Sequence, residues 1–397
     1  MSRIVSVSTI VALCVASSIA ANAQTASTRA QCSFGHAVIT EFPTPSAQSL
    51  PQALDIDAKG NIWYAETAAG KLAVLRPDLT TAEYTIPNGG QPFTPKVASD
   101  GSIWFTDSAT HAIGNLNPTT ANVQEFAIPS GGTPLFIQIA SDGNKWFTEV
   151  TGVGNLASDG TISEWIFALE HPDDNIEQLS IDPVGNIWFA ERNFDGVGAA
   201  GTNKVRRLNP KNNVVSTYLV PTFGGNPAGV HANADGTIWV SEYFANAFAL
   251  LFPKVAPHTD EVITPGSHAG FSIATGVPVT RFGRQKGVRT PVTPSVASVK
   301  PSFTLGWIEY VIPTPNTESE DMRVDRFGRL WYEGDTGFLG VLNPFAAVFA
   351  QYTIPSPDSG YYNIALDNKT GLLWFTEAGA FAAGTPTKVG NLDVGIF

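Results

Sequence analysis

Asp100-Gly101-Ser102-Ile103-Trp104-Phe105-Thr106-Asp107 is the clearest copy of a motif that recurs along the chain. A Gly beside an Asp supplies the positive φ of a tight hairpin turn, and the run after it is typical of a buried β-strand. Every copy keeps a Trp at the same place: Trp63, Trp104, Trp146, Trp188, Trp239, Trp331 and Trp374. Their spacings are 41, 42, 42, 51, 92 and 43 residues, close to the 40 to 45 residues of one four-stranded blade.

Each unit also carries three further β segments around its Trp strand. Typical examples are the alternating run Ala53–Asp57 before the motif, Ala112–Leu116 after it, and Gln124–Ile128 as a fourth segment. Few helix formers and abundant Gly (37) and Pro (28) favour an all-β protein. Four short strands cannot bury two faces alone, but seven such sheets packed face to face can. The sequence therefore predicts a seven-bladed β-propeller of four-stranded blades.

The two chain ends predict how the ring closes. The last unit has only three strand segments and finishes with Lys388–Leu392, whereas Val38–Pro43 near the start matches Thr81–Pro87, a fourth strand. We expect this N-terminal strand to complete the last blade. Closure of this kind removes open sheet edges, which otherwise invite aggregation.

One long spacing, 92 residues, marks an insertion in the fifth unit. Residues 253–305 lack the Trp motif and hold Arg281, Arg284, Lys286, Arg289 and Lys300 among Pro, Ser, Thr and Val. We expect an inserted Pro-rich, basic loop here. Such loops act as lids or partner sites, or stay weakly structured, and the sequence leaves these alternatives open.

The first residues predict export. Arg3, the apolar run Ile4–Ala20 and the small-x-small site Ala21-Asn22-Ala23 are typical of a secretory signal peptide, residues 1–23, cleaved near Ala23. Residues 24–397 then form one secreted domain without a membrane span, which we expect to be a monomer. The formal net charge of -12 argues against nucleic acid and anionic membranes as partners.

The full repeat, Pro-x-x-Ile…Asp-x-x-Gly-x-Ile-Trp-Phe-Thr-Glu…Ile-Gly-x-Leu…Glu-x-x-Ile-Pro, resembles that of the virginiamycin B lyase (streptogramin lyase) family. The resemblance covers residues 37–252 and 306–393. It implies a seven-bladed propeller that opens the lactone ring of a cyclic depsipeptide by elimination, with a divalent metal, usually Mg²⁺, as Lewis acid. It further implies His residues in a Pro-His-x-Ile pattern at the start of a first strand, and a Glu of the Trp-Phe-Thr-Glu motif as a metal ligand.

The family's His position lies eleven residues before each Trp, or twelve in the last unit. The residues found there are Gln52, Phe93, Leu135, Glu177, Ala228, Glu320 and Tyr362, and none is His. Glu177 and Glu320 are the carboxylates of this set, and two carboxylates at one mouth are suited to acid–base work or to a shared metal. We take Glu177 and Glu320 as candidate catalytic residues; the alternative is that they are solvated charges in loops. Gln52, Phe93 and Tyr362 are candidate substrate-binding residues.

A second set of candidates lies further along the first strands. His231 is a candidate catalytic residue, and at the equivalent positions Lys96 and Arg323 are candidate substrate-binding residues; the alternative is that these side chains are satisfied between blades. The Glu that ends the Trp strand gives Glu191 and Glu242 as candidate ligands for Mg²⁺ or another divalent cation. Because an acid recurs in every repeat, a structural role, accepting backbone N–H groups, is the competing interpretation.

Two classes of function follow from these residues. One is a metal-assisted lyase acting on a lactone or cyclic metabolite; a lactone hydrolase of another propeller family is a weaker enzyme alternative, because the sequence has no hydrolase signature. The other is a non-catalytic propeller that binds a glycan, peptide or protein. In both, we expect a small-molecule or glycan ligand at the mouth of the central channel.

Overall fold

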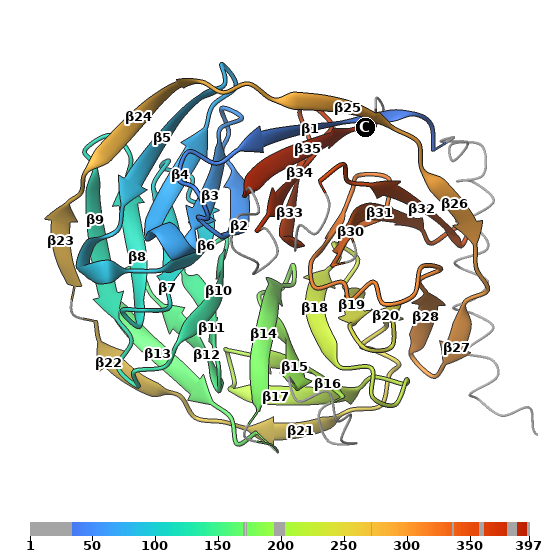
Figure 1. Ribbon diagram of the computed structural model, residues 1–397. Coiled ribbons are helices and arrows are strands. Elements are labelled where there is room, and N and C mark those ends of the chain that lie inside the picture. Colours follow the sequence, from blue (N-terminus) through green and yellow to red (C-terminus); the bar gives the residue numbers. More distant parts are fainter. Residues whose placement is uncertain are drawn as a thin grey trace, which may run out of the picture.

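The computed structural model describes residues 34–169, 171, 173–193, 203–270, 272–335, 337–356, 361–378 and 387–394. Seven sheets are arranged like blades around a central channel, and the chain is an all-β, seven-bladed β-propeller (Figure 1). The predicted signal peptide, residues 1–23, lies outside the described residues.

The first four blades follow the order of the chain, with the innermost strand first. Blade 1 contains β2 (Pro51–Ile56), β3 (Ile62–Glu66), β4 (Lys71–Leu75) and β5 (Thr80–Thr85), with the single-turn 3-10 helices η1 (Thr67–Ala69) and η2 (Pro87–Gly89) in its loops. Blade 2 contains β6 (Pro92–Val97), β7 (Ile103–Asp107), β8 (Ala112–Asn117) and β9 (Asn122–Ala127). Blade 3 contains β10 (Pro134–Ile139), β11 (Lys145–Glu149), β12 (Gly152–Leu156) and β13 (Thr161–Ile166). Blade 4 contains β14 (Asp174–Ile181), β15 (Ile187–Asn193), β16 (Lys204–Asn209) and β17 (Val214–Leu219).

The last three blades bring together more distant parts of the chain. Blade 5 contains β18 (Pro227–Ala232), β19 (Ile238–Glu242), β20 (Ala247–Leu251) and, after the insertion, β28 (Trp307–Val311). Blade 6 contains β29 (Met322–Val324), β30 (Leu330–Gly334), β31 (Phe338–Asn343) and β32 (Val348–Thr353). Blade 7 contains β33 (Tyr361–Asp367), β34 (Leu372–Glu377), β35 (Lys388–Asp393) and the N-terminal β1 (Ala37–Pro43), which pairs antiparallel with β35.

Several positions of the repeated motif have a structural reason. In blades 4 and 6 the Asp of the turn accepts a hydrogen bond from the indole N–H of the Trp, at 3.0 Å in Trp188–Asp182 and 2.9 Å in Trp331–Asp325. The Gly of the third strand faces the aromatic ring that follows the Trp, so that a Cβ on Gly114 would lie 2.1 Å from Phe105. The motif therefore specifies the packing within a blade.

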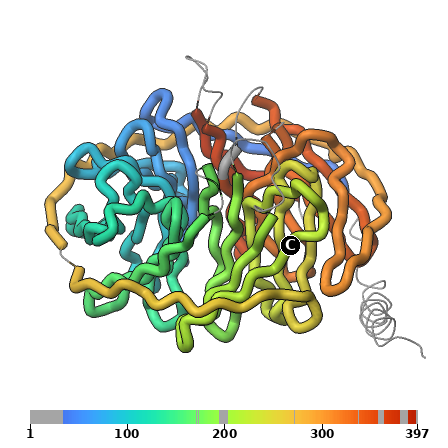
Figure 2. The backbone as a smooth tube through the Cα atoms, turned by 90° about the horizontal axis from the view of Figure 1, so that it is seen from below, coloured from blue at the N-terminus to red at the C-terminus, as the bar shows by residue number. Residues whose placement is uncertain are grey.

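The inserted segment forms a belt around the whole molecule, residues 259–304. Its strands are β21 (Thr259–Val262), β22 (Gly266–Ala269), β23 (Ser272–Gly276), β24 (Val279–Arg284), β25 (Val288–Val292), β26 (Ser295–Ser298) and β27 (Ser302–Thr304). They pair in turn with β17, β13, β9, β5, β1, β32 and β28, giving every blade a fifth strand. Figures 1 and 2 show this belt on the rim, running from blade 4 backwards round to blade 5.

The belt corrects two expectations from the sequence. Residues 253–305 were predicted as a loop and the blades as four-stranded, whereas the blades have five strands. The outermost strand of a four-stranded blade has an unpaired edge, and a strand gains about 3.3 Å per residue, so 46 residues reach about 150 Å around the rim. Pro residues are tolerated there because the belt strands are themselves edge strands.

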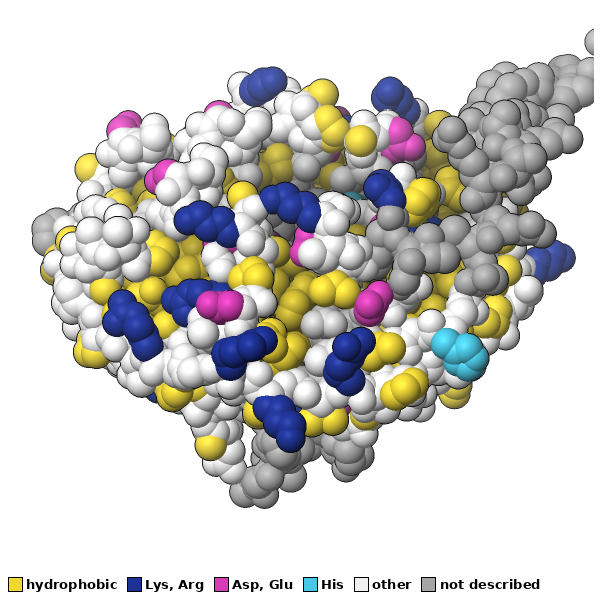
Figure 3. Space-filling view, turned by 90° about the horizontal axis from the view of Figure 1, so that it is seen from above, with side chains coloured by type: hydrophobic (Ala, Val, Ile, Leu, Met, Phe, Trp, Pro, Cys, Tyr) yellow, Lys and Arg dark blue, Asp and Glu magenta, His cyan; other side chains and the backbone are white. Residues whose placement is uncertain are grey.

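The cations of the insertion lie on the outer wall of the molecule. Arg281 and Arg284 in β24, Lys286 between β24 and β25, and Arg289 in β25 are all exposed. Figure 3 views this side and shows Lys and Arg side chains gathered over it. Among the described residues, no helix is long and apolar enough to cross a membrane.

Candidate functional site at the channel mouth

Most first strands contain a bulge at the position counted back from the Trp. In six of the blades, two residues of the first strand oppose one residue of the second. The first residues of these bulges are Gln52, Phe93, Leu135, Glu177, Ala228 and Tyr362. Bulges redirect side chains and are frequent beside functional sites. We call this end of the channel, where the first strands begin, the mouth.

A short polar side chain on the second strand holds the bulge in several blades. Thr106 accepts a hydrogen bond from the backbone N–H of Thr94 at 3.1 Å, and Ser241 accepts one from Gly229 at 2.7 Å. In blade 6 a carboxyl group takes the place of the short polar side chain. Glu333 accepts hydrogen bonds from the backbone N–H groups of both Glu320 (2.9 Å) and Asp321 (2.6 Å). Glu333 is fully buried, and its carboxylate fixes the backbone that carries Glu320.

Glu177 and Glu320, from blades 4 and 6, are brought together by an arginine from β15. Arg192 donates a hydrogen bond from Nη1 to Oε1 of Glu320 at 2.5 Å. Burial raises the pKa of Glu177 to about 8; the negative charge of Glu320 adds to this rise, and the Arg192 guanidinium opposes it. Both Glu177 and Arg192 are about 95% buried. We call Glu177, Arg192, Tyr243 and Glu320 the mouth cluster.

Tyr243 extends this cluster towards blade 6. The Arg192 guanidinium lies over the Tyr243 ring, 4.0 Å from its centroid, and the Tyr243 hydroxyl donates to Asp335 at 3.0 Å and to Glu318 at 3.2 Å. Arg192, Tyr243 and Asp335 each stand four residues after the Trp of their blade. Three neighbouring blades thus place a cation, a phenol and a carboxylate at one equivalent position.

The charge arrangement of the mouth does not fit a divalent cation. Mg²⁺ and Ca²⁺ take several oxygen ligands, whereas the space between Glu177 and Glu320 already holds the positive charge of Arg192. In the described part of the chain, no group of three or more His, Cys, Asp or Glu side chains is arranged to hold a metal ion.

The family of the chain follows from its repeats. The model of the Virginiamycin B lyase family matches residues 32–253, more than half of the chain. The chain belongs to the virginiamycin B lyase family. No curated protein matches it.

Solved structures of virginiamycin B lyases share the propeller. A structure described as streptogramin B lyase has a TM-score of 0.67 at 19% identity, covering 90% of this chain and 98% of that one. Virginiamycin B lyase from Staphylococcus aureus has a TM-score of 0.66 at 18% identity, covering 89% and 98%. A catalytically inactive histidine-to-alanine form of the S. aureus enzyme with quinupristin has a TM-score of 0.65 at 19% identity, with the same coverage. At this identity the likeness is one of fold.

This member of the virginiamycin B lyase family places its other predicted mouth residues around the channel. Phe93 packs edge-to-face on Phe136 of the next blade, with ring centroids 5.5 Å apart. Gln52 is buried, and its side-chain oxygen has no hydrogen-bond partner among the described residues. Tyr362 lies in the bulge of β33, and its side chain is outside the described part of the chain.

Further down the channel, the residues paired with the Trp are polar in six of the blades, and blade 7 has Ala365 there. His231, Lys96 and Arg323 stand opposite Trp239, Trp104 and Trp331 in the strand ladders. All three line one cavity of about 30 Å³ in the channel. The structure therefore groups the predicted residues into two layers: Glu177 and Glu320 at the mouth, and His231, Lys96 and Arg323 below.

Glu191 and Glu242, the predicted metal ligands, are enclosed within their blades. Glu191 forms ion pairs with Arg206 (2.7 Å) and Lys204 (3.7 Å). Burial, followed by the nearby Glu309 carboxyl, raises the pKa of Glu242 well above its usual value. Similar carboxyl pairs join Glu66 to Glu83, Glu149 to Glu164 and Glu377 to Glu41. As metal ligands, Glu191 and Glu242 stay a prediction, tested below by a Mg²⁺ titration.

The sequence analysis missed Arg192 and Tyr243, although a signal for both exists. Other blades carry Thr67, Ser108 or Val150 at the same distance from the Trp, so a cation and a phenol there are departures from the repeat. Both residues follow directly after the acid that ends the Trp strand, a position that the family's motif does not mark.

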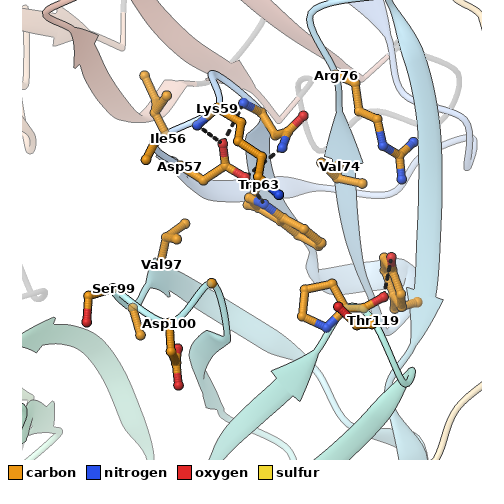
Figure 4. A pocket seen from close by; sticks show the side chains of 16 residues that line it. Ile56, Asp57, Lys59, Trp63, Val74, Arg76, Val97, Ser99, Asp100 and Thr119 are labelled. Carbon is orange, nitrogen blue, oxygen red and sulfur yellow. Dashed lines mark hydrogen bonds between the residues drawn. The ribbon is translucent and has the colours of Figure 1, made fainter.

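A separate cleft lies between blades 1 and 2, at the turns opposite the mouth. Its volume is about 680 Å³, and Figure 4 shows Trp63 across its centre with Arg76 and Lys59 beside it. Asp57 in this cleft accepts hydrogen bonds from the backbone N–H groups of Lys59 and Asn61. Trp63 is only 4% exposed, so it offers little ring surface to a ligand.

Proposed function

We propose that this chain is a lyase-type enzyme that opens an ester or lactone ring of a small molecule at the channel mouth. The observation that carries the proposal is Glu177, a buried carboxyl with a pKa of about 8 beside Arg192 and Glu320. Carboxyls whose environments differ at one mouth are typical of acid–base chemistry. Membership of the virginiamycin B lyase family supports the reaction class.

In the proposed step, ionised Glu177 removes a proton from a carbon next to a carbonyl group. The electron pair of that C–H bond forms a C=C bond, and the adjacent C–O bond breaks, its electrons leaving with the oxygen as a carboxylate. Arg192 stabilises the departing carboxylate as a charged hydrogen-bond donor. Glu177 then loses its proton to water. The product is a ring-opened isomer of the substrate, because no water is added.

The test is mass spectrometry of a panel of lactones and cyclic depsipeptides incubated with the protein. We expect a ring-opened product of unchanged mass, whereas a hydrolase adds one water. Glu177→Gln should lower the rate by about 100-fold or more, the usual contribution of a general base. Glu261→Gln, on the outer belt, is the matched control and should keep the rate. Equal rates for Glu177→Gln and the control would contradict the role of Glu177.

The pH dependence follows from the sign of the pKa shift. The raised pKa means that Glu177 is mostly protonated at pH 7 and becomes the ionised base as the pH passes about 8. We therefore expect kcat/KM to rise between pH 6 and 8.5 and then level off. A rate that falls through the same range would assign Glu177 the role of an acid instead.

The predicted divalent cation has a direct test. Because Arg192 supplies the positive charge at the mouth, we expect calorimetric titration with Mg²⁺ to give no saturable binding in the wild type. Saturable binding that disappears in Glu177→Ala or Glu320→Ala would restore the metal-assisted reaction. Binding lost in Glu191→Ala or Glu242→Ala would place the ion within those blades.

A binding propeller is the second candidate, and two exposed aromatic residues favour it. Phe223 is 74% exposed and Phe244 42%, and Phe244 packs on Tyr243 of the mouth cluster at 5.4 Å. Aromatic side chains with a wet face are common in peptide and glycan sites. Glycan and peptide arrays test this candidate: binding by the wild type that is lost in Phe244→Ala, with no turnover of any lactone, would favour it.

We also propose that the chain is exported and acts as a monomer. The support is the composition of residues 1–23, with Arg3 before an apolar run. Mass spectrometry of protein secreted by its host should place the new N-terminus near Gln24. Light scattering of the mature protein should give the mass of one chain, and a mass that doubles would contradict the monomer.

A further inference from the structure

The cavity below the mouth is lined by basic side chains and no acidic ones, although the chain as a whole is acidic. Eight of its lining residues are polar: Thr94, Lys96, Gln138, Gln178, Ser180, His231, Arg323 and Asn363. None of the residues that line it is acidic, although the chain carries 35 Asp and Glu against 23 Lys and Arg. Its volume of about 30 Å³ is room for about two water molecules. Only a very small ligand fits.

The two cations keep donors for a ligand in this cavity. Lys96 Nζ lies 3.7 Å from Oδ1 of Asp55, and Arg323 donates from Nη1 to Asp321 and to the carbonyl of Met322. An ammonium group has three donors and a guanidinium five, so these contacts leave several unused. Asp55 and Asp321 hold the cations from outside the cavity, and Asp321 also accepts from Asn363 and from the N–H of Ile364.

Gln178 provides a second and independent observation. It is the other residue of the bulge that carries Glu177, it is 94% buried, and it lines the cavity. No hydrogen bond joins its side-chain amide to another residue in the described part of the chain. Its amide nitrogen is therefore available to donate a hydrogen bond to a ligand in the cavity.

From this geometry we propose that the channel holds a small monovalent anion, of the size of chloride, bound by Lys96, Arg323 and Gln178. An anion satisfies the donors that converge there, whereas a metal cation meets two positive charges. The site lies below the mouth cluster and involves none of Glu177, Arg192, Tyr243 and Glu320. It therefore stands whether or not the mouth is catalytic.

His231 reports on the proposed anion. Burial, followed by the positive charge of Arg323, lowers the pKa of His231 to about 4, so its imidazole is neutral at pH 7. Arg323 and Lys96 line the same cavity as His231, and the strands β14 and β15, which pack against β18, carry Glu177 and Arg192. A bound anion stabilises the imidazolium form, so it raises the pKa of His231, and by linkage its own affinity rises as the pH falls.

The experiment titrates chloride into protein held in sodium gluconate at constant ionic strength. The pKa of His231 is followed by imidazole NMR, with His231→Gln used to assign the signal. We expect saturating chloride to raise this pKa by about 1 unit or more. Chloride-35 line broadening should show binding in the wild type and lose it in Lys96→Met and in Gln178→Leu.

Arg281→Met is the matched control, because it removes an exposed cation from the belt. It should keep both the pKa shift and the line broadening. The proposal is overturned if chloride leaves the pKa of His231 unchanged in the wild type, or if Gln178→Leu and Lys96→Met respond as the wild type does. If Lys96→Met does not fold, Gln178→Leu alone decides. Since none of these readouts measures turnover, their failure is separate from failure of the proposed lyase activity.

Discussion

At the scale of single residues, side chains that recur in every repeat and side chains that differ between repeats point to different roles. The acids at the end of the Trp strands recur, and Glu191 and Glu242 are buried, Glu191 beside Arg206 and Glu242 beside Glu309. Glu177 and Glu320 depart from the repeat, and these two meet at the mouth through Arg192. In the sequence Arg192 departs from the repeat as the two carboxylates do, but only the fold places this arginine between blades 4 and 6.

Glycines of the third strands give a prediction at the same scale. A Cβ on Gly114 would lie 2.1 Å from the Phe105 ring, so Gly114→Ala forces the ring to move. Overpacking a core in this way costs about 1–3 kcal/mol in the free energy of unfolding. Gly283→Ala is the control, since no atom lies within 4 Å of its Cβ, and it should change stability by less than about 0.5 kcal/mol. Urea denaturation of both variants measures the difference, and equal midpoints would contradict the packing role.

At the scale of strands, the sequence predicted the blade strands and the seven-bladed ring but not the belt. Blade strands carry alternating apolar residues and Gly-containing turns, signals that are local in the chain. Belt strands such as β21 and β22 are exposed along their length and show no such alternation. They form strands because they pair with the outer edges of β17 and β13, and those edges exist only after the blades have formed.

Strand β1 offers a test of ring closure. It lies between β35 and β25, and it buries Ile39 and Phe42 in the core. Deleting residues 37–43 removes two large buried side chains, each worth about 2–5 kcal/mol, and leaves β35 with an open edge. We expect the melting temperature to fall by about 10 °C or more. The belt variant Val288→Thr, at an exposed position, should melt with the wild type; a deletion variant that also does so would show that β1 is dispensable.

At the scale of the whole molecule, buried carboxyl pairs set the response to pH. Burial, together with a neighbouring carboxyl, raises the pKa of Glu66 and Glu377 to about 8 and that of Glu149 to about 7. In the unfolded chain these groups titrate near 4.5. Between pH 4.5 and 8 the folded protein therefore binds more protons than the unfolded chain, and its stability falls as the pH rises.

The corresponding prediction is a protein that is more stable at pH 5 than at pH 8. Each retained proton changes the free energy of unfolding by about 1.4 kcal/mol per pH unit. Asp57, Asp78 and Asp100, whose pKa values hydrogen bonds lower, act below pH 4 and leave this window unchanged. Denaturant titrations at several pH values measure the slope, which Glu66→Gln should make shallower. A free energy of unfolding that rises from pH 5 to pH 8 would contradict the assignment.

The belt has a mechanical consequence for the ring as a whole. It departs from β20 and returns to β28, and these two strands are neighbours in the ladder of blade 5. Belt and ladder together therefore form a closed circuit around the other six blades. Outward displacement of any blade lengthens the circumference of the ring. The closed circuit resists this displacement until β20 and β28 of blade 5 separate. A single proteolytic cut between β24 and β25 opens the circuit without removing one atom of the core, so the lifetime of the protein among proteases depends on its exposed belt.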